Sequence, residues 1–344
     1  MTLPILDIGD LDAGGEKRAA FLAALRQASR ELGFFYLTGH GVAPEFAREV
    51  QKVARRFFAL SEAEKRAIEM VNSPHFRGYT RLGWERTRGR PDWREQLDVG
   101  AERAVIRPGP GVPNWARLQG PNQWPESLPE LRPVLLRWQS ELTALLIRVL
   151  RAFALALDQP EDVFEPIYRD VPNQLVKIIR YPGREAEGDA QGVGAHKDSG
   201  IVTAVLQDAQ GGLQVETDGG WLDVEPIPGT LVVNMGEALE LASDGYLRAT
   251  VHRVVPPPPG SERLSVAFFL GARLDATIPF LELPPHLAAQ AKGPERDPNN
   301  PLFRQVGQNY LKGRLRSHPD VARRHYADLL EEFGIDPTEP ASAY

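Results

Sequence analysis

The chain has 344 residues, no cysteine and a net charge of −6 at pH 7. This length allows one large or two ordinary cores, and the absence of cysteine excludes a disulfide framework and a cysteine-based zinc site. The acidic balance argues against a nucleic-acid partner, and no apolar run is long enough to cross a membrane. The first residues lack the basic start and apolar block of a signal peptide, so we expect a cytoplasmic protein.

Alternating strands and helices are predicted for the first seventy residues. They are a strand over 3–8, a helix over 16–32, a strand over 34–37 and a helix from residue 44. Ser61 and Glu64 predict a capping box at the start of another short helix, because their side chains satisfy free amides there. His40 follows a strand, and we interpret it as a structural residue.

Residues 72–128 are predicted to form the longest irregular stretch of the chain. Loops of this length in a compact domain are usually functional. The stretch places arginines beside aromatic residues, a mixture that can hold an anionic or amide-bearing small molecule. Arg77, Tyr79 and Gln96 are therefore candidate substrate contacts. The alternative is a solvated, salt-bridged loop.

A single apolar stripe over 129–157 predicts one long amphipathic helix that serves as scaffold. The segment from Asn173 to Ala272 is rich in strands, with a hairpin signal at 218–220. The strands are expected at 175–181, 201–206, 212–216, 221–224, 230–234, 249–255 and 263–271. So many short strands indicate a sandwich or a barrel. A helix over 319–333 is expected to close the chain, with His318 and His325 facing solvent.

His196 and Asp198 stand two positions apart, just ahead of an apolar run. In an extended strand such residues point to the same side, so both could bind one metal ion. His252, in a second β-rich run, is the candidate third ligand. Two histidines and one carboxylate with open positions are the ligand set of non-heme Fe(II) oxygenases. The alternative is a structural histidine, since a bare His-x-Asp also occurs by chance.

Arg263 and Ser265 open the strand predicted at 263–271, and a period of two places them on one face with Ala267 and Phe269. A buried arginine inside a barrel is costly unless an anion accompanies it. A guanidinium beside a hydroxyl is well shaped to hold a carboxylate. Phe269, on the same face, is a further candidate substrate contact.

Together these motifs resemble the isopenicillin N synthase-like family of Fe(II)/2-oxoglutarate-dependent dioxygenases. His196, Asp198 and His252 match its iron ligands, and Arg263 and Ser265 match its Arg-x-Ser carboxylate clamp. Segments 179–182 and 32–42 match its tyrosine-bearing strand end and its amino-terminal Gly-Phe-Phe…His-Gly segment.

The resemblance implies an α+β fold in one oxygenase domain, 1–344. Its core would be a double-stranded β-helix, or jelly-roll, flanked by N-terminal helices, one long central helix and a C-terminal helix. The implied parts are a mainly helical 1–172 with substrate loops, a core at 173–275 with the metal site, and a C-terminal extension at 276–344.

The resemblance also implies the chemistry. Fe(II) on the catalytic residues His196, Asp198 and His252 would use O2 and 2-oxoglutarate, the latter held by Arg263, Ser265 and Tyr181. A small-molecule substrate would be hydroxylated, desaturated or cyclised, with release of succinate and CO2.

Residue 179 is isoleucine, where many plant members of the family carry asparagine. Isopenicillin N synthase shares the Ile-Arg-Tyr-Pro segment and the Arg-x-Ser pair, and it uses Fe(II) and O2 without 2-oxoglutarate. An oxidase of that type is therefore an alternative. A non-catalytic jelly-roll binding protein is another, and the sequence names neither the primary substrate nor the oligomeric state.

Overall fold

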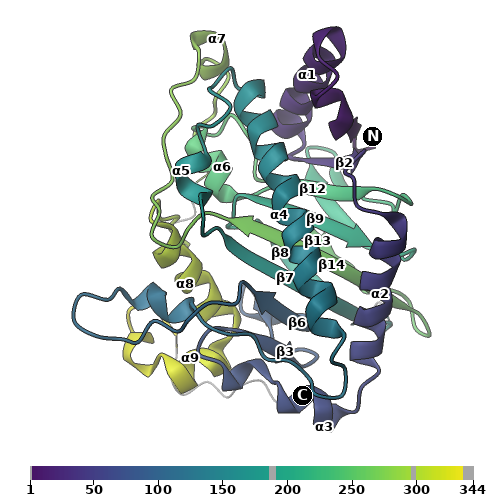
Figure 1. Cartoon of the computed structure of the whole chain (residues 1–344), viewed down its shortest axis with the longest axis vertical. Coiled ribbons are helices and arrows are strands. Elements are labelled where there is room, and N and C mark those ends of the chain that lie inside the picture. The colour runs from purple at the N-terminus through teal and green to yellow at the C-terminus, as the bar shows by residue number, and fades with distance from the viewer. Residues whose placement is uncertain (1, 186–190, 296–299, 336–344) are drawn as a thin grey trace.

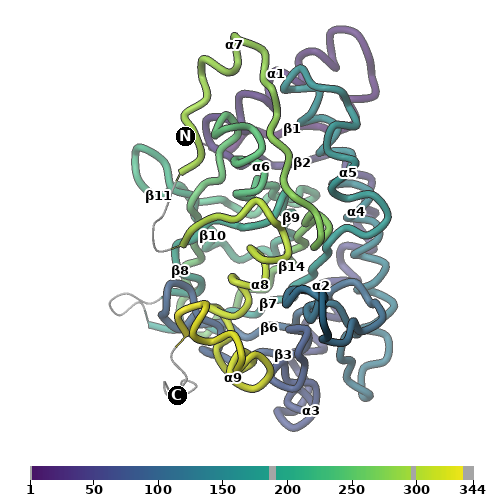
Figure 2. Tube along the Cα trace, turned by 90° about the vertical axis from the view of Figure 1, so that its left-hand side faces the viewer, coloured from purple at the N-terminus to yellow at the C-terminus, as the bar shows by residue number. Residues whose placement is uncertain are grey.

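Two β-sheets form the centre of the molecule, and helices cover the outer face of the larger sheet (Figure 1). The computed structural model describes residues 2–185, 191–295 and 300–335. Figure 2 shows the large sheet between the helices on one side and the smaller sheet on the other. Two sheets packed in this way are typical of a jelly-roll. The expected α+β fold with a jelly-roll core is confirmed.

The larger sheet takes strands from both halves of the chain, in the order β1–β2–β12–β9–β14–β7–β6–β3. The strands are β1 (Ile5–Asp7), β2 (Phe34–Thr38), β3 (Gly78–Thr80), β6 (Glu95–Gly100), β7 (Asn173–Pro182), β9 (Val202–Gln207), β12 (Leu231–Met235) and β14 (Glu262–Gly271). Strands before residue 173 thus extend this sheet beyond the segment expected to form the core. Because β3 and β6 pair with each other, part of the stretch expected to be irregular is sheet.

The smaller sheet has the order β11–β10–β13–β8. Its strands are β8 (Val193–His196), β10 (Leu213–Thr217), β11 (Gly220–Asp223) and β13 (His252–Val254). Thr217 pairs with Gly220 across the turn, so the predicted hairpin is confirmed. Gly220 has a φ of 103°, which a residue with a side chain rarely adopts. A separate short hairpin joins β4 (Arg86–Thr87) to β5 (Arg90–Pro91).

The alternation predicted along β14 separates two apolar layers. Leu264, Val266, Phe268 and Leu270 belong to the core between the large sheet and the helices. Ala267 belongs to a second core, which also contains Leu213 and Val215 of the small sheet and therefore lies between the sheets. Arg263 and Ser265, which alternate in phase with Ala267, consequently face the space between the sheets.

The expected N-terminal and central helices are present, with the long α4 packed against both α1 and α2. The helical segments are α1 (Gly15–Glu31), α2 (Pro44–Phe58), α3 (Glu62–Ala67), α4 (Leu131–Ala156), α5 (Glu165–Tyr168), α6 (Glu237–Ala242), α7 (Pro285–Ala288), α8 (Val306–Ser317) and α9 (Pro319–His325), with short 3-10 turns at Ile8–Leu11, Met70–Asn72, Asn114–Leu118 and Ala327–Leu329. Within the described ranges, no helix is long and apolar enough to span a membrane.

Local hydrogen bonds explain two predicted features of the N-terminal part. The Ser61 and Glu64 side chains bond each other's backbone amides, which confirms the capping box at α3. The ring of His40 lies 3.1 Å from the Gly229 carbonyl oxygen and accepts a bond from the Val42 amide. His40 therefore ties a turn to the sheet.

The C-terminal part differs from the expectation. The predicted helix over 319–333 is shorter, ending at His325, and α8 precedes it where no helix was predicted. His318 is 1% exposed, and its Nε2 lies 3.4 Å from a carboxylate oxygen of Glu85. The ring of His325 lies 2.9 Å from the Val71 carbonyl oxygen. The expectation that His318 faces solvent is wrong, because α8 and α9 pack against the N-terminal loops, whereas His325 is half-buried.

Candidate active site

Three potential metal ligands from two different strand ends meet between the sheets. His196, Asp198 and His252 each offer a ligand atom, and these atoms all lie within 4.8 Å of one another. The Asp198 Oδ1 atom lies 3.7 Å from His196 Nε2 and 3.8 Å from His252 Nε2. His196 and His252 are register partners on neighbouring strands, which places their rings side by side.

Backbone contacts orient both imidazoles toward this point. The Nδ1 atom of His196 lies 2.8 Å from the Gly194 carbonyl oxygen, and that of His252 lies 3.1 Å from the Thr250 carbonyl oxygen. A carbonyl oxygen can only accept, so each Nδ1 carries the proton and each Nε2 is left with a free lone pair. This is the tautomer that a metal-binding histidine requires.

The carboxylate is oriented in the same way. Asp198 Oδ2 accepts hydrogen bonds from Thr203 Oγ1 at 2.6 Å and from Asn234 Nδ2 at 2.8 Å. Its other oxygen, Oδ1, remains directed at the histidines. Thr203 and Asn234 are register partners on β9 and β12, so the sheet itself fixes the carboxylate. The donor set therefore fits a divalent iron with open coordination positions.

Electrostatics keep His196 and Asp198 in their metal-binding protonation states. Burial, followed by the neighbouring His252, lowers the pKa of His196 to about 4, so its ring is neutral at physiological pH. Burial works against the charged form of Asp198, but His252, His196 and the two hydrogen-bond donors outweigh it and hold its pKa below the usual value. A neutral imidazole and an ionised carboxylate are what coordination requires.

Asp198 lies outside β8, the strand that ends at His196. Hydrogen bonds from Thr203 and Asn234 hold the Asp198 carboxylate in place beside the two histidines.

The predicted anion clamp is buried on the inner face of the large sheet. Arg263 is 1% exposed and Ser265 is 3% exposed. The Arg263 Nη2 atom donates to Gln207 Oε1 at 2.9 Å, whereas its Nε and Nη1 atoms have no hydrogen-bond partner among the described residues. Burial lowers the pKa of the guanidinium, and Tyr181 and Asp208 offset only part of that shift. Such a group fits the distal carboxylate of 2-oxoglutarate.

Tyr181 stands directly beside this arginine, as expected. The two residues are register partners on β7 and β14, and the Arg263 guanidinium carbon lies 5.2 Å from the centre of the Tyr181 ring. Ser265 pairs with Ile179 one step further along. The unusual isoleucine thus lines the space beside the clamp with an apolar side chain.

Strand register places three of the four candidate substrate contacts. Gln96 pairs with Ile179, and Phe269 belongs to the same strand face as Ser265, so both residues face the space between the sheets. Tyr79 pairs with Leu97 and therefore faces the helices, where its hydroxyl donates to Glu95 at 2.6 Å. The interpretation of Tyr79 as a substrate contact is wrong, because a shift of one position along a strand changes the face.

Buried ion pairs fill the inner side of β6 and β7. Glu85 lies 2.9 Å from both Lys177 Nζ and Arg94 Nη2. Asp98 lies 2.9 Å from Arg314 Nη2 and 3.4 Å from Lys177 Nζ. The stretch around residue 94 is therefore part of the interior, and the alternative of a solvated loop does not hold there.

Sequence reasoning missed the residues that support the ligands. Thr203, Asn234 and Gln207 touch Asp198 or Arg263. The available signal was a polar residue on the inward face of an otherwise apolar strand, such as Asn234 within Leu231–Met235. That signal becomes readable once the direction of each strand face is known.

Comparisons with known proteins agree with this geometry. Residues 3–127 match the family model described as non-haem dioxygenase in morphine synthesis N-terminal, and residues 172–272 match the 2OG-Fe(II) oxygenase superfamily model. The chain is 37% identical to the 2-oxoglutarate-dependent dioxygenase frbJ of Dothideomycetidae sp. (strain 11243), over 96% of this chain and 94% of that protein. It is 35% identical to a homoarginine-6-hydroxylase of Arabidopsis thaliana, over 82% and 88% of the two chains.

Solved structures show the same relationship. A full-length Neurospora crassa protein in complex with alpha-KG superposes with a TM-score of 0.73 at 26% identity, covering 90% of this chain and 94% of that one. A putative 2OG-Fe(II) oxygenase family protein from Caulobacter crescentus gives a TM-score of 0.73 at 29% identity, covering 91% and 98%. The chain belongs to the 2-oxoglutarate–Fe(II) oxygenase superfamily and is a 2-oxoglutarate-dependent dioxygenase.

Proposed function

We propose that His196, Asp198 and His252 hold Fe(II), and that Arg263, Ser265 and Tyr181 hold 2-oxoglutarate, so that a small molecule is oxidised between the two sheets. The product is hydroxylated, desaturated or cyclised, with release of succinate and CO2. We further propose that residues 1–344 act as one oxygenase domain in the cytoplasm. The large sheet supports a single domain, because it combines strands from both halves of the chain.

Bound iron supplies the activation of O2 that drives oxidation of a C–H bond. The protein's own groups prepare that reaction. The backbone carbonyls keep both imidazoles in the Nδ1–H tautomer, and Thr203 and Asn234 fix the carboxylate. The apolar residues between the sheets exclude water, and Gln96 and Phe269 face the space where a substrate would lie.

The observation that carries this proposal is the Arg263 guanidinium. It is almost fully buried, and two of its nitrogens lack partners among the residues that the structure describes. A buried charge of this kind is strongly unfavourable until an anion pairs with it. A carboxylate of 2-oxoglutarate would form an ion pair with this guanidinium. Relatives of the chain are named as 2-oxoglutarate-dependent enzymes. The oxidase that works without 2-oxoglutarate has no comparable support.

The test separates an oxygenase from a binding protein. Fe(II) is titrated into the protein under anaerobic conditions and 2-oxoglutarate is then added; we expect the weak visible absorption band of a metal chelate of the oxoacid. Succinate release is then screened with amino acids, small peptides and secondary metabolites, beginning with homoarginine because relatives are named for that activity. Absence of the band at saturating iron and oxoacid would refute the assignment.

A further inference from the structure

Arg77 is a second buried arginine that forms no ion pair with the described residues. It is 4% exposed, and its Nε and Nη1 atoms lack hydrogen-bond partners within the described part of the chain. The nearby buried acids are already engaged, since Glu85 pairs with Lys177 and Arg94 while Asp98 pairs with Arg314 and Lys177. No ion pair among the described residues reaches Arg77, so it is an excess cation beside the ionic cluster.

An arginine cannot relieve this situation by losing its proton. Burial lowers the pKa of Arg77, but its ordinary value is so high that the group stays charged. A buried guanidinium without a partner is strongly unfavourable. The energetically consistent state of the site therefore includes an anion that the described residues do not provide.

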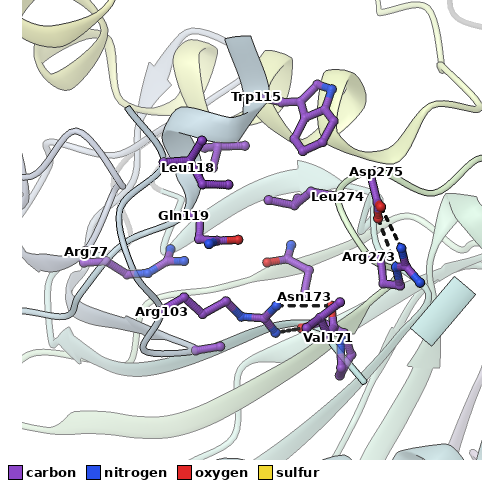
Figure 3. Close-up of a pocket in the computed structure, with 13 residues that line it drawn as sticks. Arg77, Arg103, Trp115, Leu118, Gln119, Val171, Asn173, Arg273, Leu274 and Asp275 are labelled. Atoms are coloured by element: carbon purple, nitrogen blue, oxygen red, sulfur yellow. Dashed lines mark hydrogen bonds and ion pairs between the residues drawn. The ribbon is translucent and has the colours of Figure 1, made fainter. Parts of the chain in front are cut away.

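A cavity of about 210 Å³ adjoins this guanidinium. In Figure 3 the Arg77 side chain points toward the centre of the cavity, with the amide of Gln119 beside its tip and the amide of Asn173 farther across the cavity. The remaining wall is largely apolar; it includes Ile106, Trp115, Leu118, Val171, Pro172 and Leu274. The cavity therefore suits a mainly apolar molecule with one anionic group, which Arg77 and the two amides could bind.

The other two arginines of the cavity have partners for part of their donor groups. Arg103 donates to the carbonyl oxygen of Pro172 at 2.7 Å, and Arg273 forms an ion pair with Asp275 at 2.6 Å. Figure 3 shows both sets of contacts. Among these three, Arg77 is the arginine whose buried donors lack a hydrogen-bond partner in the described part of the chain.

Strand register relates Arg77 to the metal site. Thr203, which bonds the metal-site carboxylate, pairs with Phe269; Phe269 pairs with Leu175, and Leu175 pairs with Gly100. A Cβ atom at Gly100 would overlap the Arg77 guanidinium, so the guanidinium lies over Gly100 on the inner face. These four register partners form a row across the sheet. Three interstrand spacings, roughly 14 Å, separate Thr203 at one end of the row from Gly100 at the other.

We propose that Arg77, with Gln119 and Asn173, binds the carboxylate of the primary substrate, and that this substrate is a largely apolar monocarboxylic acid on the order of 10 Å long, as the interstrand spacings indicate. The carboxylate is anchored at Arg77 while the other end of the molecule extends along the row toward the metal site. This inference rests on the proposed function, which supplies the reaction at that end. Gly100 is part of the subsite, because any side chain there would displace the guanidinium.

The experiment uses the full chain loaded anaerobically with Fe(II) and saturating 2-oxoglutarate, so that the Arg263 clamp is filled. Hexanoate and 5-phenylpentanoate, and the primary amide of each, are titrated by calorimetry. We expect each acid to bind at least tenfold more tightly than its amide. Arg77→Gln should bring that ratio close to one and leave the visible band of the iron–oxoacid complex intact. Arg103→Gln is the matched control, and it should preserve the ratio.

Gly100→Ala provides an independent variant if Arg77→Gln does not fold, and it should reduce the same ratio. The proposal is overturned if acid and amide bind equally, if neither acid binds to the loaded enzyme, or if the ratio survives both substitutions. Inorganic phosphate that binds as tightly as the acids would also overturn it, by showing a general anion site. Failure of the iron–oxoacid band would instead contradict the proposed function, so the two failures are distinguishable.

Discussion

Replacing Arg263 by methionine should have opposite effects on ligand binding and on the stability of the ligand-free protein. Methionine keeps a long apolar stem but removes the charge. Losing a buried, charge-assisted contact typically costs about 2–5 kcal/mol of binding energy, and each 1.4 kcal/mol is a factor of ten in affinity. We therefore expect the dissociation constant of 2-oxoglutarate to rise by roughly 30-fold to more than 1000-fold.

The ligand-free variant should be more stable than the wild type. Two buried donors of Arg263 lack partners among the described residues, and each such group costs about 1–3 kcal/mol. Against this gain stands the lost hydrogen bond to Gln207, worth about 1 kcal/mol. The net expectation is a free energy of unfolding raised by about 1–5 kcal/mol, similar to other replacements of buried charge by apolar groups.

Urea unfolding of the metal-free protein, with and without 2-oxoglutarate, measures both effects. A ligand at one hundred times its dissociation constant stabilises the folded state by about 2.7 kcal/mol, so the wild type should shift by about that amount and the variant by less than about 1 kcal/mol. Arg253→Met is the control, since Arg253 donates to Gln214 and stacks on Trp221 away from the clamp. An Arg263→Met protein that 2-oxoglutarate stabilises as it does the wild type would refute the clamp.

Three further predictions concern the metal site. Ala at His196 or Asp198 should abolish iron-dependent succinate release, whereas Ala at His40 should not; retained activity would remove either residue from the ligand set. Asn234→Ala should weaken Fe(II) binding by about 10–100-fold, measured by anaerobic titration, and an unchanged affinity would contradict its orienting role. Because the pKa of His196 is lowered to about 4 from 6.5, the unfolded chain binds the extra proton between these values and the metal-free protein should lose stability as pH falls through that window. His196→Gln should flatten this dependence in urea unfolding, and an identical slope would contradict the shift.

The sequence by itself predicted the residues that we propose carry the chemistry. A histidine and a carboxylate two positions apart, a second histidine in a later strand, and an arginine and a serine on one strand face are types and spacings that only a few kinds of site combine. The same holds for elements set by local rules. The capping box at Ser61 and the long apolar stripe of α4 depend on neighbours in the chain, so the pattern alone predicts them.

Only the tertiary structure decided which face each side chain occupies. Tyr79 and Gln96 both lie in the arginine- and aromatic-rich stretch, yet β3 and β6 turn Tyr79 to the helices and Gln96 to the site. The sequence predicted that His318 faces solvent. In the structure His318, between α8 and α9, lies against Glu85. Strand pairing and helix docking bring together residues far apart in the chain, and no local pattern encodes that contact. The same is true of Arg77. Its donors lack partners within the described ranges because the neighbouring acids Glu85 and Asp98 pair with other cations, and those pairs form only in the folded chain.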